Sequence, residues 1–207
     1  MTQNELHVSI SRGNAKMGAI PSVSLPPIIT CSKEACKHCG KKCYAHKIAR
    51  LRPKTVGAAW QRNLDILKSD PDKYWKEVNA AVSITKFFRF GVSGDIYDYD
   101  YFDNMVKVAR NNKDTQILCF TKQFDIVNEW LKSHRLPKNL HVIFSAWRGM
   151  EMNNPNNLPE AHVIYKDGYT TAGDGAKFCG GNCYSCCQNG VGCWNLKKGE
   201  QILFKEH

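Results

Sequence analysis

Cysteine spacing is the feature of this chain most able to do chemistry. Nine of its ten cysteines lie in two short windows, TCSKEACKHCGKKCYA at residues 30–45 and CGGNCYSCCQNGVGCW at residues 179–194. Thiolates two or three residues apart can turn toward one centre from a loop or a helix N-terminus, as zinc and iron sites require. Both windows are therefore predicted to bind metal through sulfur.

The first window has the spacing C-x4-C-x2-C-x3-C, and its predicted metal ligands are Cys31, Cys36, Cys39 and Cys43. Zinc ribbons typically use two C-x2-C pairs with a longer spacer, whereas crowded two- and three-residue gaps are typical of ferredoxin-like ligation. A [4Fe-4S] cluster is the favoured prediction and zinc is the alternative. His38 or His46 can also replace one thiolate.

The second window holds five cysteines, one more than a tetrahedral or four-iron site needs. Adjacent side chains point apart in an extended chain, so only one of Cys186 and Cys187 is expected to bind the metal. We predict that Cys187 is the one that does not. The predicted ligands are then Cys179, Cys183, Cys186 and Cys193. The spacing leaves open whether the windows form two sites or pool their ligands, so one or two clusters are expected.

The N-terminus and the thiols both indicate a cytoplasmic protein. The opening residues, MTQNELHVSISRGNAK, lack an apolar core of signal-peptide length, and no apolar run reaches the roughly 20 residues that span a bilayer. In a reducing compartment cysteines persist as metal ligands or reactive groups, and a disulfide framework is the alternative. No membrane partner is expected.

Basic residues outnumber acidic ones by 29 to 19, for a formal net charge of +10. Two four-thiolate sites would lower this to roughly +6, because each carries about −2 with its metal. Eight basic residues surround the first window: Lys33, Lys37, Lys41, Lys42, Lys47, Arg50, Arg52 and Lys54. Such a surface can favour a reduced cluster, attract nucleic acid or another polyanion, or simply be solvated. A nucleic-acid-binding module with structural zinc or iron-sulfur sites is therefore the alternative function. The expected partners are nucleic acid or another polyanion, and a redox protein.

Between the windows, short apolar runs alternate with amphipathic helical patterns. Strands are predicted over 6–11, 86–92, 115–121, 140–147 and 161–167, and helices over 44–52, 56–68, 101–111 and 124–134, with a further helix beginning at Pro71. Thr55 is predicted to cap the helix at 56–68, and Ser69 or Asp70 the next one. The alternation indicates parallel βαβ units. We expect a single domain over 1–207, with an α/β scaffold at 56–168 between cysteine segments at 1–55 and 169–207.

Polar residues follow the predicted strands where a parallel α/β sheet binds ligands. The residues expected to share the carboxyl edge are Ser93, Gly94, Asp95, Thr121, Lys122, Ser145 and Arg148. Ordinary loop chemistry is the alternative, with Asp95 or Asp98 as a helix N-cap. Cys119 lies within an apolar strand and is predicted to be a small buried hydrophobic residue.

Five motifs in order carry a family resemblance: SISRGNAKMG, SLPPIITC, CYA, SGDIYDYDYF and CFTKQ. Together they resemble the phage "gene product 88" family, whose function is uncharacterised, from about Ser9 to Trp194. The strand endings SGD and TK are also similar to phage proteins related to the radical S-adenosylmethionine superfamily. That resemblance implies a partial (β/α) barrel-like parallel sheet and, for a phage-encoded protein, action in the cytoplasm of the infected host cell.

The same resemblance implies cofactor contacts. It places Cys39 and Cys43 in the cluster loop and Ser93, Gly94 and Asp95 near the methionine part of S-adenosylmethionine, with Lys122 at the same edge. The superfamily motif is C-x3-C-x2-C, however, and that order occurs here only in the second window. A cluster held by four cysteines leaves no iron free for S-adenosylmethionine. The expected function is thus an iron-sulfur protein in a redox or radical-related role, with enzymatic activity left open.

Overall fold

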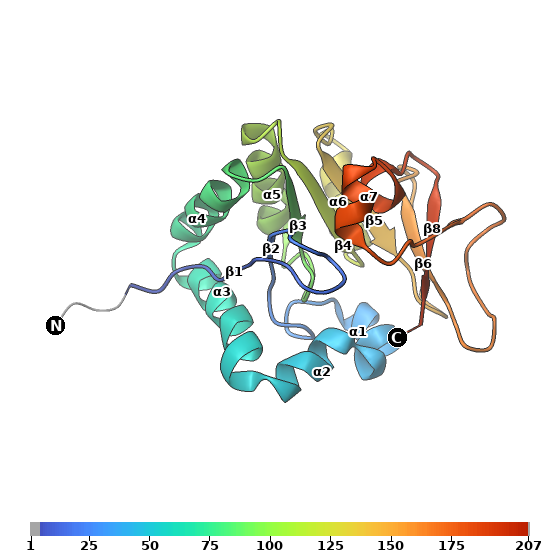
Figure 1. The fold of residues 1–207 in the computed structure, drawn as a ribbon, viewed down its shortest axis with the longest axis horizontal. Coiled ribbons are helices and arrows are strands. Elements are labelled where there is room, and N and C mark those ends of the chain that lie inside the picture. The colour runs from blue at the N-terminus through green and yellow to red at the C-terminus, as the bar shows by residue number, and fades with distance from the viewer. Residues whose placement is uncertain (1–4, 207) are drawn as a thin grey trace.

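A mostly parallel sheet runs through the centre of the computed structural model, which describes residues 5–206 (Figure 1). Its strand order is β1-β2-β3-β4-β5-β6-β8-β7. β1 pairs antiparallel with β2, and each later pair in this order is parallel. The strands are β1 (Ile10–Ser11), β2 (Ser22–Val23), β3 (Phe87–Phe90), β4 (Gln116–Thr121), β5 (Leu140–Ser145), β6 (Glu160–Ile164), β7 (Lys177–Phe178) and β8 (Gln201–Lys205). The expected α/β class is confirmed.

Helices connect the central strands as the sequence pattern predicts. α5 (Tyr99–Asn111) joins β3 to β4, and α6 (Phe124–Leu131) joins β4 to β5. The remaining helical elements are α1 (Lys33–Cys39), η1 (Gly40–Lys42), α2 (Tyr44–Leu51), η2 (Pro53–Gly57), α3 (Ala58–Ser69), α4 (Pro71–Ser83), α7 (Cys183–Gln188) and η3 (Gly192–Asn195). Asp70 accepts a hydrogen bond from the Lys73 N–H and caps α4, as predicted. No helix within residues 5–206 has the length and apolar composition needed to cross a membrane.

The two faces of the sheet bury different segments because side chains alternate along each strand. Phe88 and Phe90 face one core, which they share with α3, α4, α5 and α6 through residues such as Phe102 and Trp130. Phe87 faces the other core, where it packs at the edge of the Trp194 ring. The C-terminal segment thus covers the sheet face opposite the connecting helices.

Two sequence expectations need correction, and the prediction missed the strand β8. The strand predicted over 6–11 is restricted to Ile10–Ser11. Thr55 does not cap the next helix, because the chain after Pro53 forms a π-helical turn that leads directly into α3. β8 was not predicted, although it pairs along its whole length with β6. Residues 1–4 and 207, which belong to the predicted cysteine segments, lie outside the described residues.

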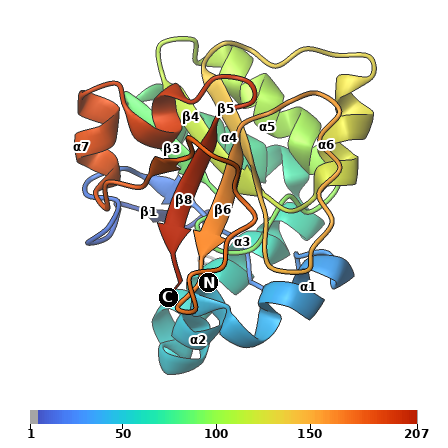
Figure 2. The same ribbon diagram turned by 90° about the vertical axis from the view of Figure 1, so that its right-hand side faces the viewer.

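The ends of the parallel strands define where a ligand could bind. Figure 2 shows β6 and β8 pointing toward α1 and α2, which therefore lie at the carboxyl edge of the sheet. α7 lies well away from α1 in both views (Figures 1 and 2). The two cysteine windows consequently occupy different parts of the fold.

Candidate functional site

The four predicted ligands of the first window, which we call the first cysteine cluster, lie around α1, η1 and the start of α2. Ser32 caps α1 by accepting a hydrogen bond from the Ala35 N–H at 3.0 Å. Cys39 ends α1, and Cys43 is the N-cap residue of α2 without a side-chain capping bond. Cys31 lies just before this cap and Cys36 lies within α1, so the four cysteines come from α1, the residue before its cap, and the start of α2.

The sulfurs of this cluster lie near one another and near the carboxyl edge. Burial raises the pKa of the Cys31 thiol to about 12, and Asp95, Cys36 and Cys39 add to the rise. Burial also raises the thiol pKa of Cys36 and of Cys39, with a contribution from Cys43 in each case. The four predicted ligands of the first window thus share one neighbourhood.

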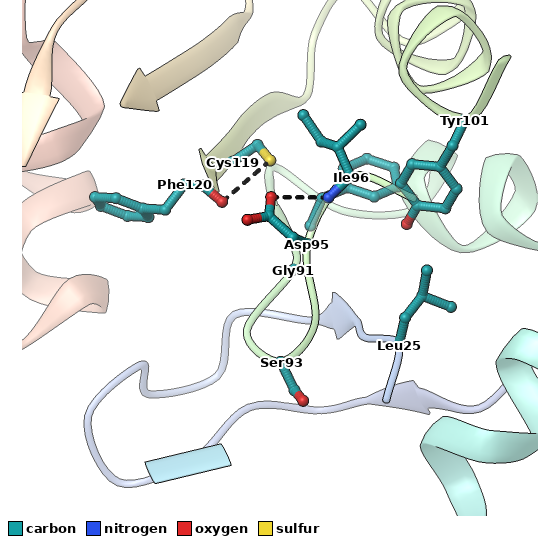
Figure 3. Close-up of a pocket in the computed structure, with 9 residues that line it drawn as sticks. Leu25, Gly91, Ser93, Asp95, Ile96, Tyr101, Cys119 and Phe120 are labelled. Atoms are coloured by element: carbon teal, nitrogen blue, oxygen red, sulfur yellow. Dashed lines mark hydrogen bonds between the residues drawn. The ribbon is translucent and has the colours of Figure 1, made fainter. Parts of the chain in front are cut away.

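Asp95 joins two loops at this edge. Its Oδ1 accepts hydrogen bonds from the Thr121 hydroxyl at 2.6 Å and the Ile96 N–H at 2.8 Å, and its Oδ2 accepts one from the Lys122 N–H at 2.9 Å. Figure 3 shows the carboxylate turned toward Ile96. Burial raises the Asp95 pKa despite the opposing charge of Lys122. The carboxylate ties the loop after β3 to the loop after β4, as the shared-edge expectation requires.

Gly94 and Ser93 pack this loop against the segment before Cys31. Gly94 has a φ of +73°, and a Cβ there would lie 2.5 Å from Thr30 Oγ1 and 2.8 Å from the Leu25 carbonyl oxygen. The Asp95 N–H also donates to Thr30 Oγ1 at 3.3 Å. The Ser93 hydroxyl is buried and has no hydrogen-bond partner among residues 5–206. The SGD sequence therefore fixes the entry into the first cysteine cluster.

A small cavity lies beneath this loop. Its volume is about 10 Å³, and Ser93, Asp95, Tyr101 and Cys119 are among its lining residues. This is roughly the space for one water molecule. Figure 3 shows Ser93 pointing away from the Asp95 carboxylate. Cys119 is 2% exposed, as its apolar strand predicts.

Two other predicted edge residues behave differently. Arg148 forms an ion pair with Asp167 at 2.7 Å, and its guanidinium lies over the rings of Tyr165 and Tyr169. These contacts hold its side chain against the segment that follows β6, and a common site with Asp95 stays a prediction. Ser145 is partly buried at the end of β5. Asp98, not Asp95, caps α5 by accepting from the Tyr101 N–H.

His38 is held by protein contacts at both ring nitrogens. Nδ1 lies 3.2 Å from the Arg148 carbonyl oxygen, and Nε2 lies 2.9 Å from Glu34 Oε1. These contacts attach α1 to the loop after β5. His38 thus has a packing role in this arrangement.

The predicted ligands of the second window, which we call the second cysteine cluster, lie around α7. Asn182 caps this helix, and the Cys183 N–H donates to the Lys16 carbonyl oxygen at 3.0 Å. The Gly181 N–H donates to Cys179 Sγ at 3.4 Å. A Cβ on Gly192 would lie 3.2 Å from Cys186 Sγ, so the glycine-rich chain passes close to the sulfurs.

Four thiols of this window also lie together. Burial raises the pKa of Cys193 to about 12, with further contributions from Cys179, Cys183 and Cys186. Burial likewise raises the pKa of Cys186, again with Cys179 and Cys183 nearby. Cys187 instead belongs to the apolar core, and its thiol donates to the Tyr184 carbonyl oxygen at 3.1 Å. Cys187 is the one buried thiol of this window, and burial raises its pKa, but Cys183 and Cys186 also raise it, so the fold keeps it close to the predicted ligands.

Arg89 is a site residue that the sequence reasoning missed. It interrupts the apolar strand FFRF, which is the signal that could have revealed it. Its guanidinium lies 4.8 Å from the centre of the Phe120 ring, and its charge opposes the raised pKa of both Cys193 and Tyr44. Arg89 thus stands between the second cluster and the helix that follows Cys43.

Two buried N–H donors near the second cluster have no acceptor in the part of the chain that the structure describes. They are Arg89 Nε and Trp194 Nε1, the latter in the residue that follows Cys193. Buried donors are nearly always paired, so each unpaired one requires an explanation. Within residues 5–206, no three His, Cys, Asp or Glu side chains are arranged as they stand to hold a metal ion.

Comparison with known proteins identifies the family. Residues 3–173 match the family model described as "Gene product 88". The chain belongs to the gene product 88 family. It is 29% identical over 182 residues to the "Gene 88 protein" of Mycobacterium phage L5, covering 82% of this chain and 71% of the relative. The "Gene 88 protein" of Mycobacterium phage D29 is 27% identical over the same lengths. No solved structure matches.

These matches confirm the resemblance to the gene product 88 family, whereas the similarity to radical S-adenosylmethionine proteins stays a prediction. The matched region contains the first cysteine cluster and the Asp95 loop. It ends at residue 173, before Cys179, the first cysteine of the second cluster. Family membership therefore bears on the first cluster and not on the second.

Proposed function

We propose that this gene product 88 family protein is an iron-sulfur protein that holds two [4Fe-4S] clusters in a redox role. One cluster would be ligated by Cys31, Cys36, Cys39 and Cys43, and the other by Cys179, Cys183, Cys186 and Cys193. The proposal rests on two four-thiol groups that lie in different parts of the fold. Each cluster would supply a one-electron couple, and the protein would set its potential.

The unpaired donors beside the second thiol group are the observation that carries the proposal. Arg89 Nε and Trp194 Nε1 are buried N–H groups that lack an acceptor in the described residues. The sulfurs of an anionic cluster accept hydrogen bonds, and such bonds tune its potential. The Gly181 N–H already donates to Cys179 Sγ. A cluster would thus provide acceptors that the protein itself does not.

The donor chemistry fits iron-sulfur ligation at both groups. Tetrahedral zinc, with Zn–S of about 2.3 Å, would draw four sulfurs to within about 3.8 Å of one another. A four-iron core occupies more space than one ion and holds its sulfurs further apart. The crowded two- and three-residue gaps between the cysteines are typical of iron-sulfur ligation and favour a cluster over zinc.

We propose that the sheet and its connecting helices form a partial (β/α) barrel. The strands from β2 to β6 follow chain order, and connecting helices cover one face of the sheet. The first cluster would then lie over the carboxyl edge, where such folds bind ligands. With four cysteine ligands it has no open iron for S-adenosylmethionine.

We place the protein in the cytoplasm of the phage-infected cell, where reduced thiols are available for iron.

Anaerobic purification followed by iron and sulfide analysis tests the proposal. Cys43→Ser and Cys186→Ser should each remove about half of the iron and one of two spectroscopic signals. Cys187→Ala, a change in the same window outside the ligand set, should keep all of it. A colourless protein with stoichiometric zinc would overturn the iron-sulfur assignment. Loss of one common signal in both serine variants would replace two clusters with one shared site.

A further inference from the structure

A basic concave surface lies beside the first cysteine cluster and takes no part in the proposed ligation. The hollow has a volume of about 430 Å³, and its wall carries four basic side chains, Lys41, His46, Lys47 and Arg50. We call these four side chains and the hollow between them the basic groove. Cys43 and Leu51 complete its wall.

Helical spacing explains how the groove forms. Cys43, His46, Lys47 and Arg50 follow one another at i, i+3, i+4 and i+7, so they share one face of α2. Lys41 faces them from η1. The opposite side of α2 is attached to the protein through the buried Ala45. The cations are therefore presented together to solvent.

No acidic residue lies near these cations along the chain. Residues 35–64 contain eight Lys and Arg residues and no Asp or Glu. Among residues 5–206, neither Lys41, Lys47 nor Arg50 forms an ion pair. By contrast, Lys37 pairs with Glu34 and Lys42 with Glu206. The groove thus keeps an uncompensated positive potential that favours an anion.

The positive surface continues beyond the hollow. Arg52 and Lys54 are exposed in the turn that follows α2. Leu51, which is 70% exposed, lies between these basic residues and offers an apolar contact. A row of cations longer than one pocket matches a polymer with regularly spaced phosphates better than a single small anion.

We propose that the basic groove binds the phosphate backbone of a nucleic acid. Its exposed cations line a hollow, which suits phosphates that protrude from a strand. An anionic lipid surface is one alternative, which anionic vesicles test. An acidic protein is the remaining alternative, and the experiment below separates it. The proposal does not depend on which metal the cysteines bind.

Fluorescence anisotropy with labelled oligonucleotides of about 20 nucleotides tests this binding, using single-stranded and duplex DNA and RNA. Replacing Lys41, Lys47 and Arg50 with Gln should weaken binding more than about tenfold. It should also reduce the slope of log affinity against log salt by about two to three, because each phosphate contact contributes about 0.7 to 0.9. The purified metal-containing protein is used throughout.

A matched control removes the same charge elsewhere. Lys76, Lys113 and Arg135 are exposed and lie outside the groove, so their triple Gln variant should bind almost as wild type. Equal weakening in both variants would show attraction by net charge alone and overturn the proposal. So would an absence of binding at low salt, or equally tight binding to polyglutamate or anionic vesicles. Unchanged iron content in both variants separates this test from that of the clusters.

Discussion

The two cysteine clusters differ in what surrounds their sulfurs. The first lies at the carboxyl edge of the sheet beside Asp95 and Lys122, and the basic groove adjoins it. The second packs against the apolar core of the opposite sheet face, with Ile143 and Trp194 nearby. The predicted ligands of both groups are partly buried, but those of the first have polar and basic neighbours and those of the second have apolar ones.

This difference indicates different roles. Cations near a cluster favour its reduced, more negative form, whereas apolar burial disfavours added charge. We therefore expect the first cluster to accept an electron more readily and to meet external partners. The second cluster, which closes the C-terminal segment onto the sheet, should contribute more to stability.

Metal removal should produce the largest difference between the two regions. Anaerobic chelation or oxidation of the clusters should raise amide exchange over residues 179–195 more than about tenfold, because thiolate metal sites contribute directly to folding. α7 has only six residues and is joined to short elements. α1 should change less, since Ser32, His38 and Thr30 attach it independently of metal.

Hydrogen-exchange mass spectrometry provides the measurement. Exchange in β4, which is buried in the sheet, serves as the internal control and should stay slow. Equal loss of protection at α1 and α7 would contradict the contrast between an accessible and a stabilising cluster.

Local patterns predicted the central scaffold well. The alternation of apolar runs and helical stripes between Phe87 and Ser145 appears as β3, α5, β4, α6 and β5. Each of these elements buries its own periodic face, so neighbouring residues carry the information. The grouping of thiols within each window follows equally from short spacings.

The features that the sequence did not predict depend on contacts between segments that are distant in the chain. β8 is five residues long and finds its partner, β6, about forty residues earlier, so no local pattern identifies the pair. Thr55 is a good cap by type, but Pro53 begins a wider turn that displaces it. Asp95 is a plausible cap by position, but Thr121 and Lys122 hold it in a cross-loop network. Arg89 belongs to the site because the C-terminal segment, which is distant in sequence, covers the face of its strand.

Two glycine substitutions compare how tightly the clusters are supported. Gly94→Ala should destabilise the protein by about 3 kcal/mol, since it adds both left-handed strain and a clash with Thr30 Oγ1 and the Leu25 carbonyl. Gly181→Ala should cost only about 1–2 kcal/mol, because its φ is +83° but nothing lies within 4 Å of the added Cβ. Urea unfolding monitored by circular dichroism measures both. A larger cost at Gly181 would show that the second cluster is the more rigidly packed one.

The smallest predicted effect is a pH dependence near the second cluster. Burial lowers the pKa of His141, whose Nε2 lies 2.8 Å from Gln116 Oε1 and whose ring lies 6.3 Å from that of Trp194. The folded state therefore favours the neutral ring, and this contribution to stability is present above the unfolded pKa of about 6.5 and lost as pH falls. His141→Gln should reduce the loss of unfolding free energy between about pH 7.5 and pH 5.5, relative to wild type. If His141→Gln and wild type lost the same unfolding free energy over this range, the pH dependence would not distinguish the two cysteine clusters, and the contrast would rest on exchange and packing alone.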